Sequence, residues 1–446
     1  MSAEVRKLQP QALWNNFEDL NAVPRPSKRE ERVIAFIKSF AQGLNLEYTI
    51  DKIGNVIVKK PASSGMENHT PIVLQAHLDM VHQKNGDTDF DFDTQGIQSY
   101  VDGDWVKAKG TTLGADNGMG VAAMMTVLQS DSIAHPPLEA LFTIDEEAGM
   151  TGAHNLEPNK LEGKILLNLD TEDDDELSIG CAGGIDTTIH WNYTEEDCQA
   201  DYETFQVSVR GLMGGHSGMD IIYGRGNANK IMTRLLAEIY EKFAARLSYF
   251  QGGNVRNAIP READAIISLP SYNVDAFKDY IDGESIVLKE EFKTTDPQLS
   301  FQYKAVTPAN KVMEVVDQQK ILMALSCCHD GIKRLSPDVD DLVETSNNLS
   351  KVTIEKGKAE ILTLQRSDRE SGKTDMARTV AAPFKLIGAN VEHSGSYPGW
   401  KLDPDSEMLQ VMKNLYIEMF NEQPQVKACH AGLECGLIGQ HYPHMH

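Results

Sequence analysis

The sequence predicts an α/β protein in which a domain with a mainly parallel sheet is interrupted by an inserted α+β domain. Over the first 170 residues, short apolar runs alternate with stretches of helical periodicity, which is typical of a parallel sheet with crossover helices. After Gly180-Cys-Ala-Gly-Gly184 the apolar residues recur with period two, as in strands that have one solvated face. From Pro404 onward, one helical stretch and one strand-like run suggest that the chain re-enters the first domain.

The first domain opens with helical periodicity over residues 10–45. Pro24-Arg-Pro26 divides this stretch into two helices, because proline lacks the amide hydrogen that a helix interior needs. Another helix is predicted over about residues 118–128. Apolar runs too short for helices predict buried strands at residues 54–59, 72–76, 140–144 and 165–169.

We predict that residues 1–183 and 401–446 form the first domain and that residues 184–400 form the insertion. The ending Gly439-Gln-His-Tyr-Pro-His-Met-His446 carries no pattern of a closing helix or strand. A frayed or truncated C-terminus is therefore expected, rather than a metal-chelating histidine tail.

The inserted domain is predicted to contain one long amphipathic helix and several alternating strands. The helix is expected over about Ala228 to Phe250, where apolar residues gather on one side. The strands are expected near residues 187–191, 204–210, 262–269, 299–305 and 352–364.

Composition restricts the possible functions. The net charge of −24 over 446 residues argues against nucleic acid and anionic membranes as partners, since both need a basic face. The polar N-terminus does not resemble a signal peptide, and no apolar run is long enough to cross a bilayer, so we expect a cytoplasmic protein. The six cysteines form no CxxC pair, which argues against a thiolate zinc site and a disulfide framework.

Five acids and one histidine lie at or near the ends of the predicted buried strands. Each alone has an ordinary explanation, as a core histidine or as an aspartate that caps a helix. Because the carboxyl ends of parallel strands meet at one edge of a sheet, we expect these side chains to converge. Such a cluster of acids calls for divalent cations to neutralise it. The six residues are His77, Asp79, Asp116, Glu146, Glu147 and Asp170.

Glu146 and Glu147 are adjacent in the sequence. If the segment is extended, their side chains point in opposite directions, so one can bind metal while the other remains available as a general base.

With these motifs the chain resembles the M20 family of dinuclear zinc aminopeptidases and amidohydrolases, over nearly its whole length. The resemblance implies a zinc-peptidase-like catalytic domain with an inserted lid that carries the contacts of a homodimer. It also implies that Asp116 joins two Zn²⁺ ions, the first held with His77 and Asp170 and the second with Glu147. Cobalt or manganese could replace zinc.

The remaining catalytic roles also follow from the resemblance. Asp79 would orient His77, and Glu146 would be the general base that activates a metal-bridged hydroxide. The peptide bond between Asp116 and Asn117 would be cis.

Four positions of the inserted block and the last segment match family residues that contact the substrate. His216, in Gly214-Gly-His-Ser-Gly218, would stabilise the oxyanion; the alternative is an exposed histidine in a turn. The resemblance further implies that His216 reaches the active site of a partner subunit. Asn257 and Gly432 would contact the substrate backbone.

Arg366 would bind the substrate's free carboxylate, for which its planar fork is suited. Arg369 is a rival for this role, and a surface salt bridge is the alternative for Arg366.

The resemblance implies metal-dependent hydrolysis of unblocked dipeptides, including Xaa-His and β-alanyl-histidine. The alternatives are an M20 tripeptidase, an N-acyl amidohydrolase, or a truncated chain that has one metal site and acts mainly in dimerisation or binding. The last alternative arises because the family takes a final ligand of the second zinc from a histidine that none of His441, His444 and His446 matches.

Overall fold

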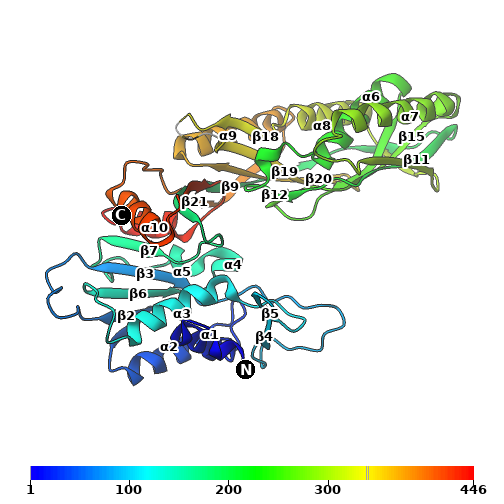
Figure 1. Ribbon diagram of the computed structural model, residues 1–446. Coiled ribbons are helices and arrows are strands. Elements are labelled where there is room, and N and C mark those ends of the chain that lie inside the picture. Colours follow the sequence, from blue (N-terminus) through cyan, green and yellow to red (C-terminus); the bar gives the residue numbers. More distant parts are fainter. Residues whose placement is uncertain (1, 338, 340) are drawn as a thin grey trace. The chain divides into compact units, whose positions relative to one another are not determined.

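The computed structural model describes residues 2–337, 339 and 341–446, and it divides into two compact units (Figure 1). Unit 1 consists of Met1–Ser178, Pro404–Val426 and Leu437–His446, and unit 2 consists of Ile179–Asp403 and Lys427–Gly436. The chain therefore returns to unit 1 after residue 403, and a ten-residue piece near the C-terminus belongs to unit 2.

Unit 1 is built on a five-stranded sheet in the order β1-β2-β6-β3-β7. The β3, β6 and β7 strands are parallel, whereas β1 and β2 form an antiparallel hairpin at one edge, with β2 also antiparallel to β6. The α/β class is thus confirmed, although only half of the strand pairs are parallel. The elements that lie in or begin in unit 1 before the crossing to unit 2 are α1 (Gln11–Asn21), α2 (Glu31–Gly43), β1 (Glu47–Ile50), β2 (Val56–Lys60), β3 (Ile72–His77), β4 (Ser99–Asp102), β5 (Trp105–Ala108), α3 (Ala115–Gln129), β6 (Leu138–Thr143), α4 (Glu146–Gly149), α5 (Thr151–His154), β7 (Ile165–Asn168) and β8 (Glu176–Cys181).

Helices α1, α2 and α3 pack on one face of this sheet, where alternate strand residues such as Leu74, Ala76, Ala140 and Phe142 join a single apolar core. Val73, Gln75 and His77 have the opposite parity on β3 and so face the other side of the sheet. His77 is the last residue of β3, and this places its imidazole at the carboxyl edge of the parallel strands.

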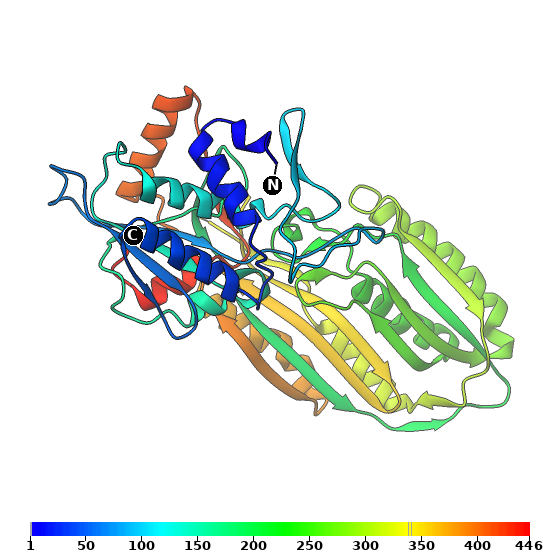
Figure 2. The same ribbon diagram turned by 90° about the horizontal axis from the view of Figure 1, so that it is seen from below.

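Unit 2 contains a nine-stranded sheet in the order β16-β11-β15-β13-β19-β20-β9-β21, with β18 paired to β19. Helices α6, α7, α8 and α9 share one core with one face of this sheet, as Figures 1 and 2 show. The elements are β9 (Gly183–Asn192), β10 (Glu195–Asp197), β11 (Tyr202–Arg210), β12 (Gly215–His216), α6 (Ala228–Phe243), β13 (Arg246–Gly252), β14 (Ala258–Ile259), β15 (Ala263–Pro270), α7 (Val274–Glu291), β16 (Ser300–Ala305), β17 (Lys311–Met313), α8 (Val315–Cys327), β18 (Gly331–Leu335), β19 (Val343–Glu355), β20 (Lys358–Ser367), α9 (Glu370–Leu386) and β21 (Asn390–Tyr397).

Two sequence-based boundaries were wrong. The helix expected to reach Phe250 ends at Phe243, because Ala244 takes a left-handed conformation (φ 55°) and β13 begins at Arg246. The single strand expected over residues 352–364 belongs to the hairpin β19-β20, which turns at Lys356-Gly357, both with positive φ.

The C-terminal segment also differs from expectation, since α11 (Glu434–His441) follows α10 (Glu407–Phe420) and β22 (Gln425–Cys429). Within the residues that the structure describes, no helix is both long and apolar enough to span a bilayer.

Candidate functional site

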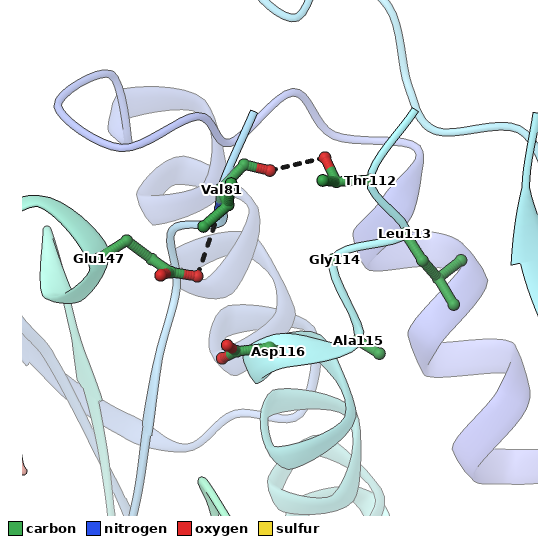
Figure 3. Close-up of a pocket in the computed structure, with 7 residues that line it drawn as sticks. All are labelled: Val81, Thr112, Leu113, Gly114, Ala115, Asp116 and Glu147. Atoms are coloured by element: carbon green, nitrogen blue, oxygen red, sulfur yellow. Dashed lines mark hydrogen bonds between the residues drawn. The ribbon is translucent and has the colours of Figure 1, made fainter. Parts of the chain in front are cut away.

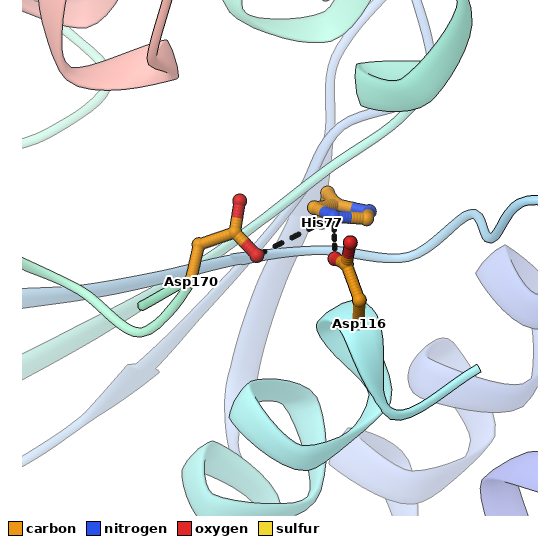
Figure 4. A group of neighbouring side chains, drawn as sticks. All are labelled: His77, Asp116 and Asp170. Carbon is orange, nitrogen blue, oxygen red and sulfur yellow. Dashed lines mark hydrogen bonds and ion pairs between the residues drawn. The ribbon is translucent and has the colours of Figure 1, made fainter. Parts of the chain in front are cut away.

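The strongest candidate for a metal centre in unit 1 consists of His77, Asp116 and Asp170. His77 Nε2 lies 2.9 Å from Asp116 Oδ1 and 3.6 Å from Asp170 Oδ1. Figure 4 shows the imidazole and the two carboxylates turned toward one another. One ligand atom from each residue lies within 4.8 Å of the other two, so a single cation could contact all three.

The electrostatics of this group are those of crowded acids. Burial and the charge of Asp116 raise the pKa of Glu147 to about 7, and the same two causes raise the pKa of Asp170. Burial alone would lower the pKa of His77, but the neighbouring carboxylates of Asp116, Asp170 and Asp79 outweigh it and raise that pKa well above its ordinary value. The acids therefore attract positive charge. A divalent cation supplies two such charges, whereas protonation of the His77 ring supplies one.

Asp116 does not cap α3, contrary to the ordinary explanation for an aspartate in a turn. Its carboxylate makes no capping hydrogen bond, and it faces His77 instead. The bond between Asp116 and Asn117 is cis, as the resemblance implies.

Asp79 does two things at once. Its Oδ1 lies 3.3 Å from His77 Nδ1 and accepts the amide hydrogen of Glu146, while Oδ2 accepts from the Ser27 hydroxyl and the Glu147 amide. Asp79 thus turns Nε2 of His77 toward Asp116 and Asp170, and it also caps the first turn of α4.

A second buried group of acids, Glu30, Asp79 and Asp145, has ligand atoms within 4.8 Å of one another. Because the Asp79 oxygens are already occupied by the contacts just described, this carboxylate has little capacity left for a cation. The group that contains His77 is therefore the better metal site.

Glu146 and Glu147 do not lie in an extended segment, which was the case considered from the sequence. They begin α4, because Asp79 binds their two amides. Consecutive helical residues still diverge, by roughly 100° about the axis. Glu147 Oε1 accepts from the Val81 amide at 3.3 Å. Figure 3 shows Glu147 and Asp116 on a cavity of about 200 Å³, which is lined by Val81, Thr112, Leu113, Gly114, Ala115, Asp116 and Glu147.

Arg25 supports the site, although the sequence analysis treated it only as part of a helix break. Its side chain is fully buried, and its guanidinium donates to the backbone carbonyls of Leu78, Asp79 and Gly114. One residue therefore holds the segment after β3 and the segment before α3 in place. In the sequence, only the position of Arg25 between Pro24 and Pro26 distinguished it from other arginines, and this pattern does not predict its structural role.

In unit 2, His216 and Arg366 lie together. His216 Nδ1 accepts the amide hydrogens of Gly218 and Met219, at 3.3 and 3.1 Å, so the proton of the neutral ring is assigned to Nε2. Burial and the charge of Arg366 lower the pKa of His216 to about 4, which keeps the ring neutral near pH 7. Nε2 lies 3.4 Å from Arg366 Nη2, and with the proton assigned to Nε2 both nitrogens are donors.

Arg366 is only 4% exposed, which excludes the surface salt bridge considered for it. Its Nη1 donates to the Tyr397 hydroxyl at 2.8 Å, and within the described chain its buried Nε–H has no hydrogen-bond partner. The rival Arg369 is 39% exposed and lies at the start of α9. A buried guanidinium with unpaired donors is suited to an anion.

The other two predicted substrate contacts are placed by their backbones. The Asn257 carbonyl accepts the amide hydrogen of Ser217, the residue after His216, while the Asn257 side chain is exposed. Gly432 lies in the irregular segment between β22 and α11. Tyr397, which binds Arg366, carried no sequence motif of its own. His430 begins the His430-Ala-Gly-Leu-Glu434 stretch that holds Gly432, but the sequence analysis assigned it no separate role.

Comparison with known proteins identifies the family. The chain is 42% identical to the cytosol non-specific dipeptidase of Escherichia coli over 443 residues, which cover 99% of this chain and 91% of the relative. The chain belongs to the M20 family of metallopeptidases. This membership implies an enzyme that uses a divalent metal, and the His77, Asp116 and Asp170 donor set fits one.

Family models match each part of the chain separately. Residues 55–203 match the model of peptidase family M28, and residues 207–290 match the peptidase dimerisation domain. The M20 dimerisation match begins in β11 and ends in α7.

The fold also matches solved structures. Aminoacylhistidine dipeptidase from Vibrio alginolyticus superposes with a TM-score of 0.89 at 44% identity, covering 99% of this chain and 90% of that chain. Aminopeptidase PepT from Bacillus cereus, at 17% identity and a TM-score of 0.53 over 97% and 88% of the two chains, shares the fold.

Proposed function

We propose that this M20 enzyme is a dipeptidase that hydrolyses unblocked dipeptides, including Xaa-His and β-alanyl-histidine, with two Zn²⁺ ions. The observation that carries the proposal is the convergence of His77, Asp116 and Asp170 in a chain 42% identical to a dipeptidase. The name of that relative, a cytosol dipeptidase, also supports a cytoplasmic location for this chain.

His77, Asp116 and Asp170 would hold the first metal ion, and Asp116 with Glu147 would contribute to the second. When bound, such a pair polarises the peptide carbonyl and lowers the pKa of water to about 7. The Asp79 carboxylate, 3.3 Å from Nδ1 of His77, keeps Nε2 directed at the ligand position.

The proton transfers are assigned to Glu146, which would accept a proton from water and deliver it to the leaving amine. Its amide is bound to Asp79, so the carboxylate that orients His77 also fixes the start of the helix that carries the base. His216 would donate from Nε2 to the developing oxyanion.

Arg366 would bind the free carboxylate of the dipeptide, with Asn257 and Gly432 beside the substrate backbone. The unpaired Nε–H of Arg366 supports this assignment, because Nε and Nη2 together form the side of a guanidinium that binds a carboxylate through two hydrogen bonds. An amidated C-terminus would lose this charge-assisted contact.

The tripeptidase and N-acyl amidohydrolase alternatives share the metal ligands. The 42% identity to a dipeptidase over nearly the whole chain favours the dipeptidase over both. The dimerisation-domain match supports a homodimer formed through unit 2.

Zinc titration of the metal-free protein, combined with a substrate panel, tests the proposal. We expect one Zn²⁺ to bind more tightly than the second, because three ligands converge at the first position and two are assigned to the second. Alanyl-histidine should be cleaved faster than a tripeptide or an N-acetylated amino acid. Preferred cleavage of either of the last two would replace the dipeptidase assignment.

A further inference from the structure

His430 is a buried histidine in unit 2 to which the proposed function assigns no role. It lies directly after β22 and is only 6% exposed. Its Nε2 lies 2.8 Å from the Ser346 hydroxyl. Nδ1 is buried and makes no hydrogen bond of acceptable geometry within the described chain, although an interaction with the Val343 backbone acts to raise the pKa of the ring. An unpaired polar atom at such a position carries a desolvation cost that a ligand could remove.

The hydrogen bond to Ser346 fixes which ring nitrogen carries the proton. If the Ser346 hydroxyl donates to Nε2, only Nδ1–H remains unpaired. If Nε2 donates instead, both the serine hydrogen and the Nδ1 lone pair are left unpaired. The first tautomer leaves fewer unsatisfied groups, so Nδ1 is assigned as a donor.

His430 belongs to the same group of side chains as Arg366. Ser346 on β19 pairs directly with Arg366 on β20, so their side chains lie next to one another on one face of the sheet. This face is opposite to the helices, because Ile361, which has the other parity on β20, belongs to the helix-covered core.

The row continues through Gly184 on β9 to Tyr397 on β21, which binds Arg366 through its hydroxyl. A Cβ on Gly184 would lie 2.4 Å from the Tyr397 ring, so glycine is needed for the tyrosine to reach Arg366.

Gly218 brings His430 close to His216 as well. A Cβ on Gly218 would lie 2.2 Å from the His430 carbonyl oxygen and 3.1 Å from His216 Cε1. Burial, followed by the charges of Arg366 and His216, lowers the pKa of His430 to about 3, so its ring is also neutral near pH 7. Arg366, His216 and His430 therefore lie close together, and two of them, Arg366 and His430, carry buried nitrogens without a hydrogen-bond partner in the described chain.

We propose that His430 is a substrate-binding residue whose Nδ1–H donates, together with Arg366, to the C-terminal carboxylate of the dipeptide, with Ser346 and Tyr397 as positioning residues. This inference rests on the proposed dipeptidase function. It adds a residue that selects for an unblocked C-terminus. In a C-terminally amidated dipeptide, the amide NH₂ would face the Nδ1–H of His430, and two donors cannot form a hydrogen bond.

Two substitutions at His430 test the contributions of its two ring nitrogens separately. Glutamine can place a polar group near Nε2 and keep contact with Ser346, but it has no donor at Nδ1. Asparagine can place its amide near Nδ1 and loses Ser346. We expect His430→Gln to raise the KM for alanyl-histidine by about 10- to 100-fold with a much smaller change in kcat, which is the scale of a hydrogen bond to a charged group. His430→Asn should raise it by less.

Alanyl-histidinamide is the discriminating substrate, and His190→Gln, an exposed histidine on β9, is the matched control. His430→Gln should affect the amide far less than the acid, and the control should match the unmodified enzyme. Ser346→Ala should give an intermediate rise in KM for the acid, if its hydroxyl fixes the ring.

Equal losses on the acid and the amide, or a fall in thermal stability and kcat at unchanged KM, would assign His430 a structural role and overturn the inference. If the unmodified enzyme cleaves no dipeptide, the proposed function itself fails. If it cleaves alanyl-histidine and His430→Gln leaves KM unchanged, only the role of His430 fails.

Discussion

The two groups of buried polar residues differ in what they lack. The group in unit 1 is rich in acceptors, because Asp116, Asp170 and Glu147 bring carboxylates to one imidazole. The group in unit 2 is rich in donors, because Arg366 and His430 keep buried N–H groups without partners in the described chain. In the proposed function, cations complete the first group and the substrate carboxylate completes the second.

Burial shifts the pKa values of both groups, in opposite directions. It raises the pKa of Glu147 to about 7 in unit 1, and it lowers the pKa of His430 to about 3 in unit 2. In each case burial favours the uncharged form of the side chain. The comparison teaches that loss of solvent can prepare one chain for ligands of both signs, and the following experiments test each side of it.

The largest effect is expected from Asp116→Ala, which removes a carboxylate of the acceptor-rich group. Turnover should become undetectable and metal content should fall, because the remaining acids keep their repulsion but lose a ligand. Asp79→Asn should weaken metal binding less, by about 10- to 100-fold, since Asp79 orients His77 but is not itself assigned as a metal ligand. Elemental analysis that finds full zinc content in Asp116→Ala would remove Asp116 from the metal centre.

Glu146→Gln should lower kcat by about 10²- to 10⁴-fold while metal content stays unchanged, because it removes proton transfer and no ligand. Glu162→Gln, at a 77% exposed side chain, is the control. A Glu146→Gln enzyme that retains its turnover but loses zinc would exchange the roles assigned to Glu146 and Glu147.

On the donor-rich side, Arg366→Lys should raise the KM for dipeptides by about 10- to 100-fold, because an ammonium cannot reproduce the two parallel hydrogen bonds of a guanidinium. Steady-state kinetics with Arg369→Lys as the comparison should show no such rise. The reverse result would transfer carboxylate binding to Arg369.

The smallest effect concerns stability and pH. The folded-state pKa of His430 is about 3, below the ordinary value of 6.5, so protonation favours the unfolded chain. The stabilising contribution is complete above about pH 6.5 and is lost as the pH falls toward 3, with a slope of up to about 1.4 kcal/mol per pH unit.

Urea denaturation of the metal-free protein at several pH values between 7 and 4 measures this slope. His430→Gln should reduce this slope by the contribution of one proton. A slope that is unchanged in His430→Gln would mean that His430 titrates as it does in the unfolded chain.

The acceptor-rich group was predictable from the sequence, whereas most of the donor-rich group was not. His77 and Asp170 follow short buried strands, and parallel strands bring their ends to one edge, so local patterns were enough to place them together. The helical start at Glu146 escaped prediction, because it depends on capping by Asp79, which lies 67 residues earlier.

His430 and Ser346 are 84 residues apart, and Ser346 meets Arg366 only through the register of the β19-β20 hairpin. That register includes a shift between Leu349 and Lys351, which no periodic pattern announces. The family resemblance identified Arg366 as a candidate site residue. The residues beside it in the sheet, Ser346, Gly184 and Tyr397, could not be identified, because they are brought there by pairing between strands that are distant in the sequence.

Arg25 has a consequence for the order in which the molecule assembles. Its guanidinium binds carbonyls 53, 54 and 89 residues further along the chain. During synthesis this arginine emerges early, and its last partner, Gly114, follows only after β3 and the β4-β5 hairpin have been made. Closing such loops is entropically expensive and slow compared with helix formation. We therefore expect the region around the metal ligands to be among the last parts of unit 1 to gain protection in a pulsed hydrogen-exchange experiment, well after α1 and α2.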